Sequence, residues 1–267
     1  MAKKRLDVLL VERGLCVSRE RAKTTLMAGY VQVDGQRQDK PGTLISEEAI
    51  ITVAGDPIGF VSRGGLKLAK AVKTFEIDLQ GKRMIDVGAS TGGFTDCALQ
   101  NGAVAVTAVD VGYGQLAWKL RTDPRVLNLE RTNVRFLTLE QAGGELFDFA
   151  SIDVSFISLS KVLPIVAALL KDGAEAVALI KPQFEAGRQD VGKKGVVRDP
   201  AVHCRVIDGV LAAIASIGFS PLGLTFSPVK GPEGNIEYLL HLKKTTISEV
   251  HSPDVAAVVA QAHQTLD

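Results

Sequence analysis

The sequence MIDVGASTGGF, residues 84–94, joins a short apolar run to a glycine-rich turn. The apolar run is typical of a buried strand, and the glycines allow the chain to turn sharply before a helix begins. Such a turn brings backbone N–H groups close to a ligand at the end of a strand. The stretch therefore indicates a strand–loop–helix unit of an α/β fold, with a binding loop that starts at Gly88.

The loop departs from the dinucleotide-binding pattern. That pattern is Gly-x-Gly-x-x-Gly, and Ser90 stands where it requires the second glycine. The departure favours a nucleoside ligand without a pyrophosphate, such as S-adenosylmethionine, over a purely structural turn. Asp110 lies 22 residues after Gly88 and is positioned to accept both ribose hydroxyls, and Asn133 is positioned to reach the adenine edge. The predicted cofactor residues are Asp86, Gly88, Ala89, Ser90, Thr91, Gly92, Gly93, Phe94, Asp110 and Asn133.

Outward from this unit, strand-like and helix-like segments alternate. Strands are predicted at residues 83–87, 104–110, 126–129, 147–153, 174–181, 221–226 and 236–242, and helices at 66–74, 94–101, 114–121, 159–170 and 200–217. This alternation predicts an α/β fold with a mostly parallel, Rossmann-like sheet covered on both faces. No helix separates the last two strands, so we expect them to pair antiparallel at one edge. A final helix is predicted to begin at Ser252 and Pro253.

Four charged residues are expected at one edge of this sheet. Asp153 and Lys181 end two apolar strands, and Glu237 opens the last strand, which runs backwards. Lys67 lies at the start of the first helix after the linker. Since ligands bind beyond the carboxyl ends of parallel strands, these side chains are predicted to meet in one cleft. The alternative is a set of separate surface ion pairs, which would contribute little to stability.

Such a cluster suits the activation of a weak nucleophile. A partly buried, neutral lysine can accept the proton of a ribose 2′-hydroxyl or hold the oxyanion that develops. Carboxylates on either side orient the ammonium group and tune its pKa. Because the methyl donor is a sulfonium, in-line placement matters more than strong acid catalysis.

The first 60 residues follow a different pattern. Two short helices are predicted within residues 5–26, the second starting after Ser18 as its cap and running from Arg19 to Ala28. Strands at 30–33 and 49–53 follow, with Asp34-Gly35 as a hairpin signal. Residues 55–59 break every pattern and are predicted to form a linker.

Basic residues are in excess in two parts of the chain, although the formal net charge is only +1. Residues 1–25 hold seven basic and three acidic residues, and residues 181–205 hold six basic and three acidic ones. Such excesses can follow a phosphate backbone. Each basic region, taken alone, is explained at least as well by an ordinary solvated helix face or loop as by binding to a phosphate backbone.

The composition excludes several classes of protein. Of the 267 residues, 46% are hydrophobic and 23% are charged, and no run of 18 apolar residues occurs, so neither long disorder nor a membrane-spanning helix is expected. The N-terminus has no signal-peptide pattern. Three separated cysteines and four histidines without ligand spacing indicate a cytoplasmic protein with no disulfide framework and no metal site.

These residues resemble those of a known enzyme family. The second part of the chain resembles the FtsJ-like ribose methyltransferases, whose Lys-Asp-Lys-Glu tetrad is matched in order by Lys67, Asp153, Lys181 and Glu237. The whole chain is similar to the TlyA family of rRNA 2′-O-methyltransferases, long catalogued as haemolysins, at residues 61–68, 86–94, 153–159, 181–187 and 231–238. The first 55 residues resemble the S-four RNA-binding module at residues 5–7, 18–19, 22 and 29–35.

The resemblance implies S-adenosylmethionine-dependent 2′-O-methylation of cytidine in rRNA, within a ribosomal subunit or its precursor. It implies an RNA-binding domain at 1–55, a linker at 56–61, a methyltransferase domain at 62–245 and a helical tail at 246–267. Phe60 stands where some relatives carry Trp, which leaves the role of the linker open. No oligomer is implied. RNA contacts are predicted from Lys4, Arg5, Arg19, Arg21, Lys23, Arg63, Arg188, Lys193 and Lys194.

Three other functions are compatible with parts of the sequence. The family's historical label suggests a membrane-acting cytolysin, and residues 256–263 can form a surface helix, but that segment lacks a basic face. A non-catalytic RNA-binding factor would leave the tetrad without a role. A small-molecule methyltransferase would leave the N-terminal module and the basic loop without one.

Overall fold

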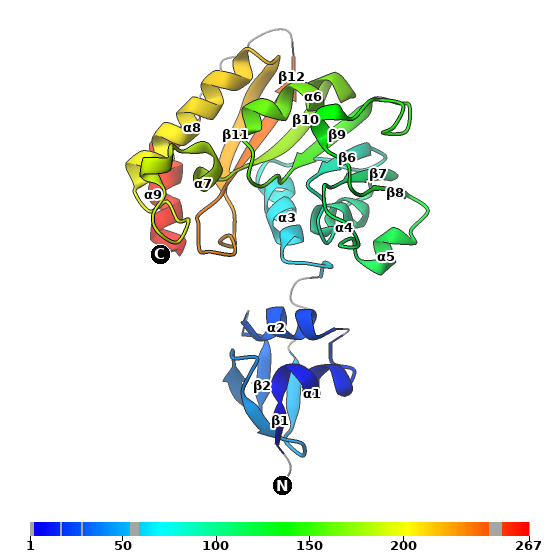
Figure 1. Ribbon diagram of the computed structural model, residues 1–267, viewed down its shortest axis with the longest axis vertical. Helices are drawn as coiled ribbons and strands as arrows, with labels where there is room; N and C mark the ends of the chain where they lie inside the picture. The colour runs from blue at the N-terminus through cyan, green and yellow to red at the C-terminus, as the bar shows by residue number, and fades with distance from the viewer. Residues whose placement is uncertain (1–2, 17, 28, 54–58, 246–252, 267) are drawn as a thin grey trace. The chain divides into compact units, whose positions relative to one another are not determined.

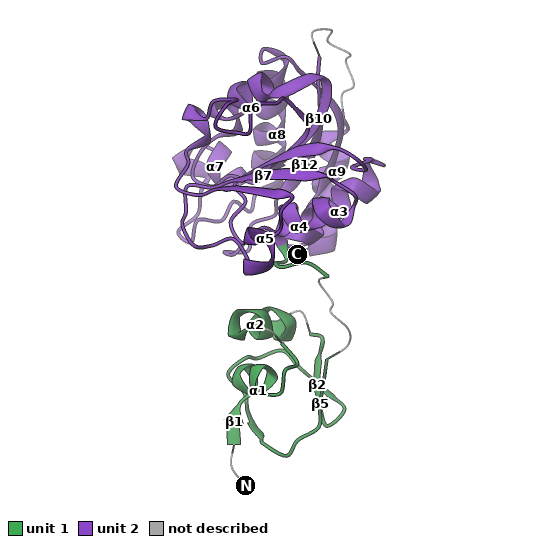
Figure 2. Ribbon diagram, turned by 90° about the vertical axis from the view of Figure 1, so that its right-hand side faces the viewer, with its two compact units in different colours: residues 1–63 green, residues 64–267 purple. Residues whose placement is uncertain are grey.

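The computed structural model describes residues 3–16, 18–27, 29–53, 59–245 and 253–266, which fall into two compact units (Figure 1; Figure 2). The first unit comprises residues 1–63 and the second comprises residues 64–267. Each unit has a hydrophobic core of its own, as expected of a domain.

In the first unit, two helices pack on short strands. α1 (Leu6–Glu12) and α2 (Arg19–Met27) confirm the two predicted helices, and the Ser18 hydroxyl caps the second by accepting from the N–H of Arg21 at 3.1 Å. Ala28, where that helix was expected to end, lies outside the described residues. β2 (Val31–Val33) pairs antiparallel with β3 (Gln36–Gln38) and with β5 (Ile51–Val53), and the hairpin turn between β2 and β3 has the expected positive φ angles.

A second strand pair in this unit was not predicted. β1 (Lys3–Arg5) pairs antiparallel with β4 (Leu44–Ser46). Strands of three residues are too short to show a period of two in the sequence, so tertiary contacts alone reveal them.

The second unit is built on a seven-stranded sheet with the order β11-β12-β10-β9-β6-β7-β8 (Figure 1). The strands from β10 to β8 are parallel, and β12 pairs antiparallel with both β10 and β11. The strands are β6 (Arg83–Val87), β7 (Ala105–Val109), β8 (Val126–Leu129), β9 (Phe147–Ile152), β10 (Leu170–Ile180), β11 (Phe219–Phe226) and β12 (Tyr238–Lys244). The predicted fold class is confirmed, and β12 lies inside the sheet with β11 at the edge.

Helices follow most of these strands. The α-helices are α3 (Gly64–Thr74), α4 (Gly93–Gln100), α5 (Trp118–Arg121), α6 (Leu163–Leu169), α7 (Pro182–Glu185), α8 (Pro200–Ala215) and α9 (Val255–Leu266), and the 3-10 turns are η1 (Val134–Phe136), η2 (Leu159–Lys161) and η3 (Arg188–Asp190). Residues of α6, α8 and α9 share one buried core with the sheet, and α3 packs beside α4. Among the described residues, none of the helices is long and apolar enough to cross a membrane.

Three predicted helix boundaries are wrong for local reasons. The helix expected at 159–170 is split into η2 and α6, because Pro164 can only begin a new helix, and Leu170 already opens β10. The helix expected at 114–121 begins only at Trp118, since Gly114 has a φ of +69°. Ser252 lies outside the described residues, but Pro253, expected in the first turn, precedes α9, which begins at Val255. Asp254 caps this helix by accepting from the N–H of Ala257 at 3.0 Å.

Candidate active site

Four charged side chains meet at the edge of the sheet where β9 and β10 end and β12 begins. Lys67 Nζ, on α3, lies 2.7 Å from Glu237 Oε2 and 3.5 Å from Asp153 Oδ2. Lys181 Nζ lies 2.5 Å from Asp153 Oδ1. The four residues therefore form one continuous chain of ion pairs, Glu237–Lys67–Asp153–Lys181. The topology explains the meeting, because β12 runs against β10 and its first residues reach the edge where β10 ends.

This cluster is almost completely buried. Lys67 and Lys181 are each 8% exposed, and Glu237 is 1% exposed. Burial by itself lowers the pKa of Lys67, but the carboxylates of Asp153 and Glu237 together hold that pKa above its ordinary value. Lys67 is therefore protonated at neutral pH. Because desolvation offsets most of the attraction in a buried ion pair, such a network is better explained by a functional role than by stability.

The glycine loop lies directly beside this cluster. Gly88 has a φ of +88°, and a Cβ added there would lie 2.5 Å from the backbone oxygen of Asp153. The N–H of Asp153 in turn donates to the carbonyl of Val87 at 2.9 Å. No side chain therefore separates the start of the loop from the end of β9, and a ligand held by the loop is next to Asp153.

Asp110 holds the loop in place and keeps acceptor capacity. Its two carboxylate oxygens accept from the N–H groups of Ser90 at 2.8 Å and Gly112 at 2.7 Å. A carboxylate has about four acceptor sites, and Asp110 is partly exposed, so it can still accept from ribose hydroxyls. The side-chain oxygen of Asn133 is already used in a hydrogen bond, because it caps η1 by accepting from the N–H of Arg135 at 3.1 Å.

Asp86 faces the protein interior. It is fully buried, and its carboxylate accepts from the hydroxyl of Thr95 at 2.7 Å, the N–H of Thr95 at 3.0 Å and the hydroxyl of Ser151 at 2.7 Å. Burial raises the pKa of Asp86 to about 6 despite these donors. Asp86 thus joins β6, β9 and α4. Because it is fully buried, it supports the loop that follows β6 and is not exposed to a cofactor itself.

The remaining loop residues divide by exposure. Ser90 is exposed and Thr91 is partly exposed, whereas Ala89, Gly92, Gly93 and Phe94 are buried. Gly92 has a φ of +93°, and a side chain there would collide with Leu116 and Leu120. The surface that the loop offers a ligand is therefore formed mainly by Ser90 and Thr91.

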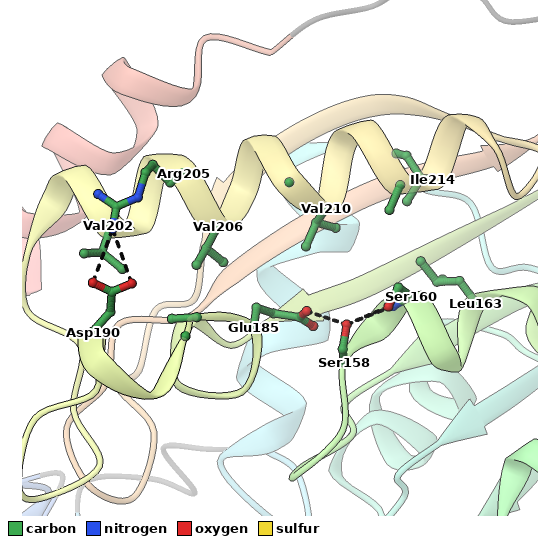
Figure 3. A pocket seen from close by; sticks show the side chains of 14 residues that line it. Ser158, Ser160, Leu163, Glu185, Asp190, Val202, Arg205, Val206, Val210 and Ile214 are labelled. Carbon is green, nitrogen blue, oxygen red and sulfur yellow. Dashed lines mark hydrogen bonds and ion pairs between the residues drawn. The ribbon is translucent and has the colours of Figure 1, made fainter.

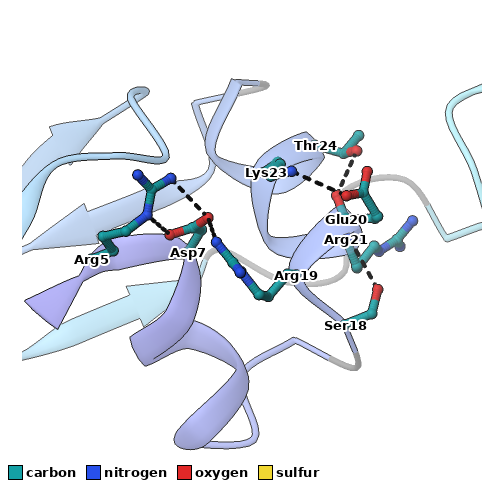
Figure 4. A network of polar contacts seen from close by, with 8 residues as sticks. All are labelled: Arg5, Asp7, Ser18, Arg19, Glu20, Arg21, Lys23 and Thr24. Atoms are coloured by element: carbon teal, nitrogen blue, oxygen red, sulfur yellow. Dashed lines mark hydrogen bonds and ion pairs between the residues drawn. The ribbon is translucent and has the colours of Figure 1, made fainter.

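The predicted RNA-binding residues of the first unit form ion pairs within the protein, but their side chains remain partly exposed to solvent. Figure 4 shows Arg5 and Arg19 converging on Asp7, at 2.9 and 3.1 Å, and Lys23 paired with Glu20 at 3.0 Å. The side chains of Arg5 and Arg19 are 47% and 55% exposed. Their free faces can still meet a phosphate backbone.

Further basic residues of the first unit are held in the same way. Lys4 lies 2.8 Å from Glu12, and Arg21 donates to the carbonyl of Phe60 at 2.6 Å, while Arg63 is exposed. The Arg21 contact ties the linker residue Phe60 to α2. In the second unit, Arg188, Lys193 and Lys194 are exposed.

The structure adds residues that the sequence analysis missed beside the cluster. Ser155 accepts from Lys181 Nζ at 3.0 Å. Phe156 is 90% exposed, has a φ of +63° and contacts Phe184, with 4.8 Å between the ring centroids. An exposed aromatic ring in a strained backbone conformation is a signal of function. In the sequence, both phenylalanines read as ordinary apolar residues.

Arginine–aromatic pairs form a second surface that sequence reasoning missed. The guanidinium of Arg131 lies 4.1 Å from the ring centroid of Tyr113, and that of Arg135 lies 5.5 Å from the ring centroid of Phe136. Tyr113, Phe136 and Trp118 are between 68% and 75% exposed. Cations alternating with exposed rings are typical of surfaces that stack nucleic-acid bases.

A cavity of about 360 Å³ lies beside the cluster rather than in it, between η2, α7 and α8 (Figure 3). One wall is apolar, with Val202, Val206, Val210 and Ile214 from α8. The opposite wall contains Glu185, whose carboxylate accepts from the Ser158 hydroxyl (Figure 3).

Comparisons with known proteins match both parts of the chain to described families. Residues 60–244 match the FtsJ-like methyltransferase family, and residues 4–51 match the S4 domain. The chain is 53% identical to YqxC of Bacillus subtilis over 99% of its own length and 95% of that protein's length. It is 47% identical to the 16S/23S rRNA (cytidine-2′-O)-methyltransferase TlyA of Mycobacterium tuberculosis, over 91% of this chain and 90% of that one.

A solved structure from Streptococcus thermophilus, whose name includes the word hemolysin, is also similar. It shares 49% sequence identity and a TM-score of 0.79, over 99% of this chain and 97% of that one. These relatives therefore cover both units of the chain.

Proposed function

The chain belongs to the FtsJ-like methyltransferase family, and from this premise we propose that it transfers a methyl group from S-adenosylmethionine to the 2′-hydroxyl of a cytidine ribose in rRNA. The observation that supports this most strongly is the position of the Glu237–Lys67–Asp153–Lys181 chain directly beside the Gly88 loop. The substrate class rests on the likeness to the rRNA methyltransferase TlyA.

The residues at the loop fit S-adenosylmethionine. Gly88 leaves the loop without a Cβ where it meets the end of β9, and the partly exposed Asp110 offers acceptors for two ribose hydroxyls. No feature of the loop requires a pyrophosphate. When bound, S-adenosylmethionine supplies an electrophilic methyl group on a positively charged sulfur.

Lys181 is the residue to which we assign contact with the 2′-oxygen. Its Nζ is held between Asp153 Oδ1 and Ser155 Oγ, so its third N–H is available to a substrate. In the reacting form, Lys181 is the free amine, and its nitrogen accepts the proton of the 2′-hydroxyl as the oxygen attacks the methyl carbon. The ammonium group that results lies beside Asp153 and stabilises the negative charge that develops on the oxygen.

Lys67, Asp153 and Glu237 then act as the support of Lys181. Lys67 is protonated and is paired with both Glu237 and Asp153, so neither carboxylate is left without a cationic partner. This arrangement fixes the position of Lys181 before the substrate arrives, which is where most of the rate enhancement is expected.

RNA recognition is assigned to both units. The S4 domain carries Arg5, Arg19, Arg21 and Lys23. The exposed Phe156 and the Tyr113–Arg131 pair suit bases that have left a stack. We place the reaction on a ribosomal subunit or its precursor, and the cytoplasmic location expected above follows from that substrate.

The cytolysin alternative rests on the family's historical label, and the structure removes the one membrane-binding segment considered for it. Residues 256–263 were considered as an amphipathic surface helix, but α9 buries Val259 and Ala262 in the same core as α8 and the sheet. An apolar face that is already packed inside the protein is not free to enter a membrane.

The test of this function uses radiolabelled S-adenosylmethionine and ribosomal subunits from cells that lack the protein. The wild-type chain should label rRNA, and the label should migrate with 2′-O-methylcytidine after digestion to nucleosides. Lys181→Ala should bind S-adenosylmethionine within about threefold of wild type and lose at least 100-fold in rate, in line with the loss of a general base or an oxyanion donor. Labelling at the wild-type rate would show that the role assigned to Lys181 is wrong.

A further inference from the structure

Glu185 follows the candidate catalytic residue Lys181 by four positions and contacts a different part of the same loop. Its Oε1 accepts from the N–H of Leu159 at 2.8 Å, and its Oε2 accepts from the hydroxyl of Ser158 at 2.7 Å (Figure 3). Ser158 is the cap of η2. The carboxylate therefore binds α7, which begins just after Lys181, to the end of the loop that begins at Asp153.

These two segments are joined at three places in matching order. Lys181 contacts Asp153 and Ser155, Phe184 contacts Phe156, and Glu185 contacts Ser158 and Leu159. The first contact joins side chains only, and so does the second, which involves an exposed ring. Only the third reaches a backbone group, the N–H of Leu159, so it links α7 directly to the backbone at the end of the loop.

Packing holds Leu159 in the core, but it leaves one side of the Glu185 contact unfilled. The cavity of about 360 Å³ borders Glu185, Ser158 and Ser160, so the side of the two segments that faces α8 is not filled by side chains. Both donors to Glu185 are neutral, and burial raises the pKa of its carboxyl group. A carboxylate that is buried without a charged donor costs stability, which favours a functional reason for its presence.

We propose that Glu185 is a positioning residue for methyl transfer, which holds the Asp153–Phe156 loop at the correct distance from Lys181. This inference rests on the proposed function, since it concerns the same site. Lys67 and the backbone of Val87 hold the start of the loop at Asp153. Without Glu185, the end of the loop loses its hydrogen bonds to α7, and the direct links between the two segments are reduced to the Phe156–Phe184 contact and the contacts of Lys181 with Asp153 and Ser155. The distance between Lys181 and the substrate ribose is then less well fixed. A displacement of about 1 Å at a reacting centre can lower a rate by about 100-fold.

The test compares Glu185→Ala, Glu185→Gln and Ser158→Ala with a matched control, Glu175→Gln. Glu175 lies in the middle of β10, six positions before Lys181; it is partly buried and accepts from His241 at 2.9 Å. Glutamine at 185 can still accept from the N–H of Leu159 and donate to Ser158, so it should restore most of the function. The protein is assayed as the full chain with ribosomal subunits, under single-turnover conditions.

We expect Glu185→Ala to lose between 10- and 100-fold in the methyl-transfer rate, Ser158→Ala to lose less, and Glu185→Gln and Glu175→Gln to stay within about fivefold of wild type. Affinity for S-adenosylmethionine, measured by calorimetry, should be unchanged in all four. The pH midpoint of the rate should move in Glu185→Ala, because Lys181 no longer keeps its distance to Asp153. Hydrogen exchange at the N–H of Leu159 should accelerate in Glu185→Ala and not in Glu175→Gln.

Three results would overturn the proposal. The first is a rate in Glu185→Ala equal to that of wild type. The second is an equal loss in Glu185→Gln and Glu185→Ala, because the hydrogen bonds would then not be the cause. The third is a loss in all variants that follows their melting temperatures, without any shift of the pH midpoint. A wild-type protein that labels no rRNA would instead overturn the proposed function, whatever the exchange rate at Leu159.

Discussion

At the scale of single residues, Lys67 links the two carboxylates of the cluster. It is the cation beside both Asp153 and Glu237, and Glu237 is 1% exposed. Removing one partner of a buried ion pair leaves the other charge uncompensated, at a cost of about 3–5 kcal/mol. Lys67→Met should therefore lower the free energy of unfolding by about 3 kcal/mol.

A double variant separates stability from activity. Lys67→Met combined with Glu237→Gln removes both charges, so urea denaturation should show that most of the lost stability returns. Methyl transfer should remain absent in the double variant, because Lys181 and Asp153 have lost their support. A single variant that costs less than about 1 kcal/mol would contradict the buried ion-pair chain.

Phe156 combines exposure with backbone strain, and the two can be tested separately. Its φ of +63° costs an L-residue roughly 1–2 kcal/mol, so Phe156→Gly should raise stability. Loss of the ring should raise the KM for the RNA substrate by about tenfold or more, as expected for one stacked base. Phe156→Tyr is the control and should keep a KM close to that of wild type. An unchanged KM in Phe156→Gly would exclude a stacking role.

The depressed pKa of Asp7 should make the stability of the first unit depend on pH in the acid range. The hydrogen bond from Arg5 and a second one from Arg19 lower the pKa of Asp7 to about 2 from an ordinary value of 3.8. Because the folded pKa is depressed, the stabilisation is complete above about pH 4 and is lost as the pH falls from 4 toward 2. With discounting for the exposed arginines, the effect amounts to about 1 kcal/mol.

The measurement is the calorimetric unfolding of wild type and Asp7→Asn between pH 2 and pH 6. Asp7→Asn should melt below wild type at pH 6, and the difference between the two should vanish near pH 2. A difference that is independent of pH would mean that the carboxylate charge is not what stabilises the unit.

At the scale of helices and strands, Gly209 is a weak point of α8. It lies inside the helix and borders the cavity, and a Cβ added there would meet nothing within 4 Å. Glycine inside a helix costs roughly 0.5–1 kcal/mol relative to alanine. Gly209→Ala should therefore raise the melting temperature by a few degrees without changing methyl transfer. A destabilised variant would show that the cavity wall is closer to Gly209 than described.

The strands that carry the candidate site could be predicted because they are long and almost wholly apolar. β6, β8 and β9 lie within one residue of their predicted ends, and the polar residues that follow β9 and β10 were recognised from their position alone. The insertion of β12 between β10 and β11 depends on register and has no signal in the sequence. The same holds for Ser155 and Glu185, whose roles follow from contacts between segments more than 20 residues apart.

The cofactor residues show the same limit. The spacing of Gly88, Ser90 and Asp110 indicated a nucleoside site, since a glycine turn and an acid after the next strand have few other uses together. Sequence alone did not distinguish Asp86, which is sealed in the interior, from Ser90, which faces solvent. That difference is set by the packing of α4 on β6 and β7.

At the scale of the whole molecule, charge should govern RNA affinity. Lys193 and Lys194 are exposed, and they follow Lys181 by little more than ten residues along the chain. In the first unit, the side chains of Arg5 and Arg19 are about half exposed. Each phosphate contact adds about 0.7 to the slope of log affinity against log salt for single-stranded RNA. Lys193→Ala with Lys194→Ala should therefore reduce the slope by about 1.4 if each lysine contacts one phosphate. A flat salt response in the wild type would argue against contact between these residues and phosphates.

The most direct test of the central claim is a map of 2′-O-methylcytidine in rRNA from cells without the protein, complemented with either the wild-type chain or Lys181→Ala. The wild-type chain should restore one or more methylated cytidines that are missing from the deletion strain, and Lys181→Ala should restore none while it accumulates as a folded protein. If the maps of the deletion strain and of the complemented strain are identical, or if Lys181→Ala restores the marks, the buried chain of ion pairs is not the centre at which this protein methylates ribose.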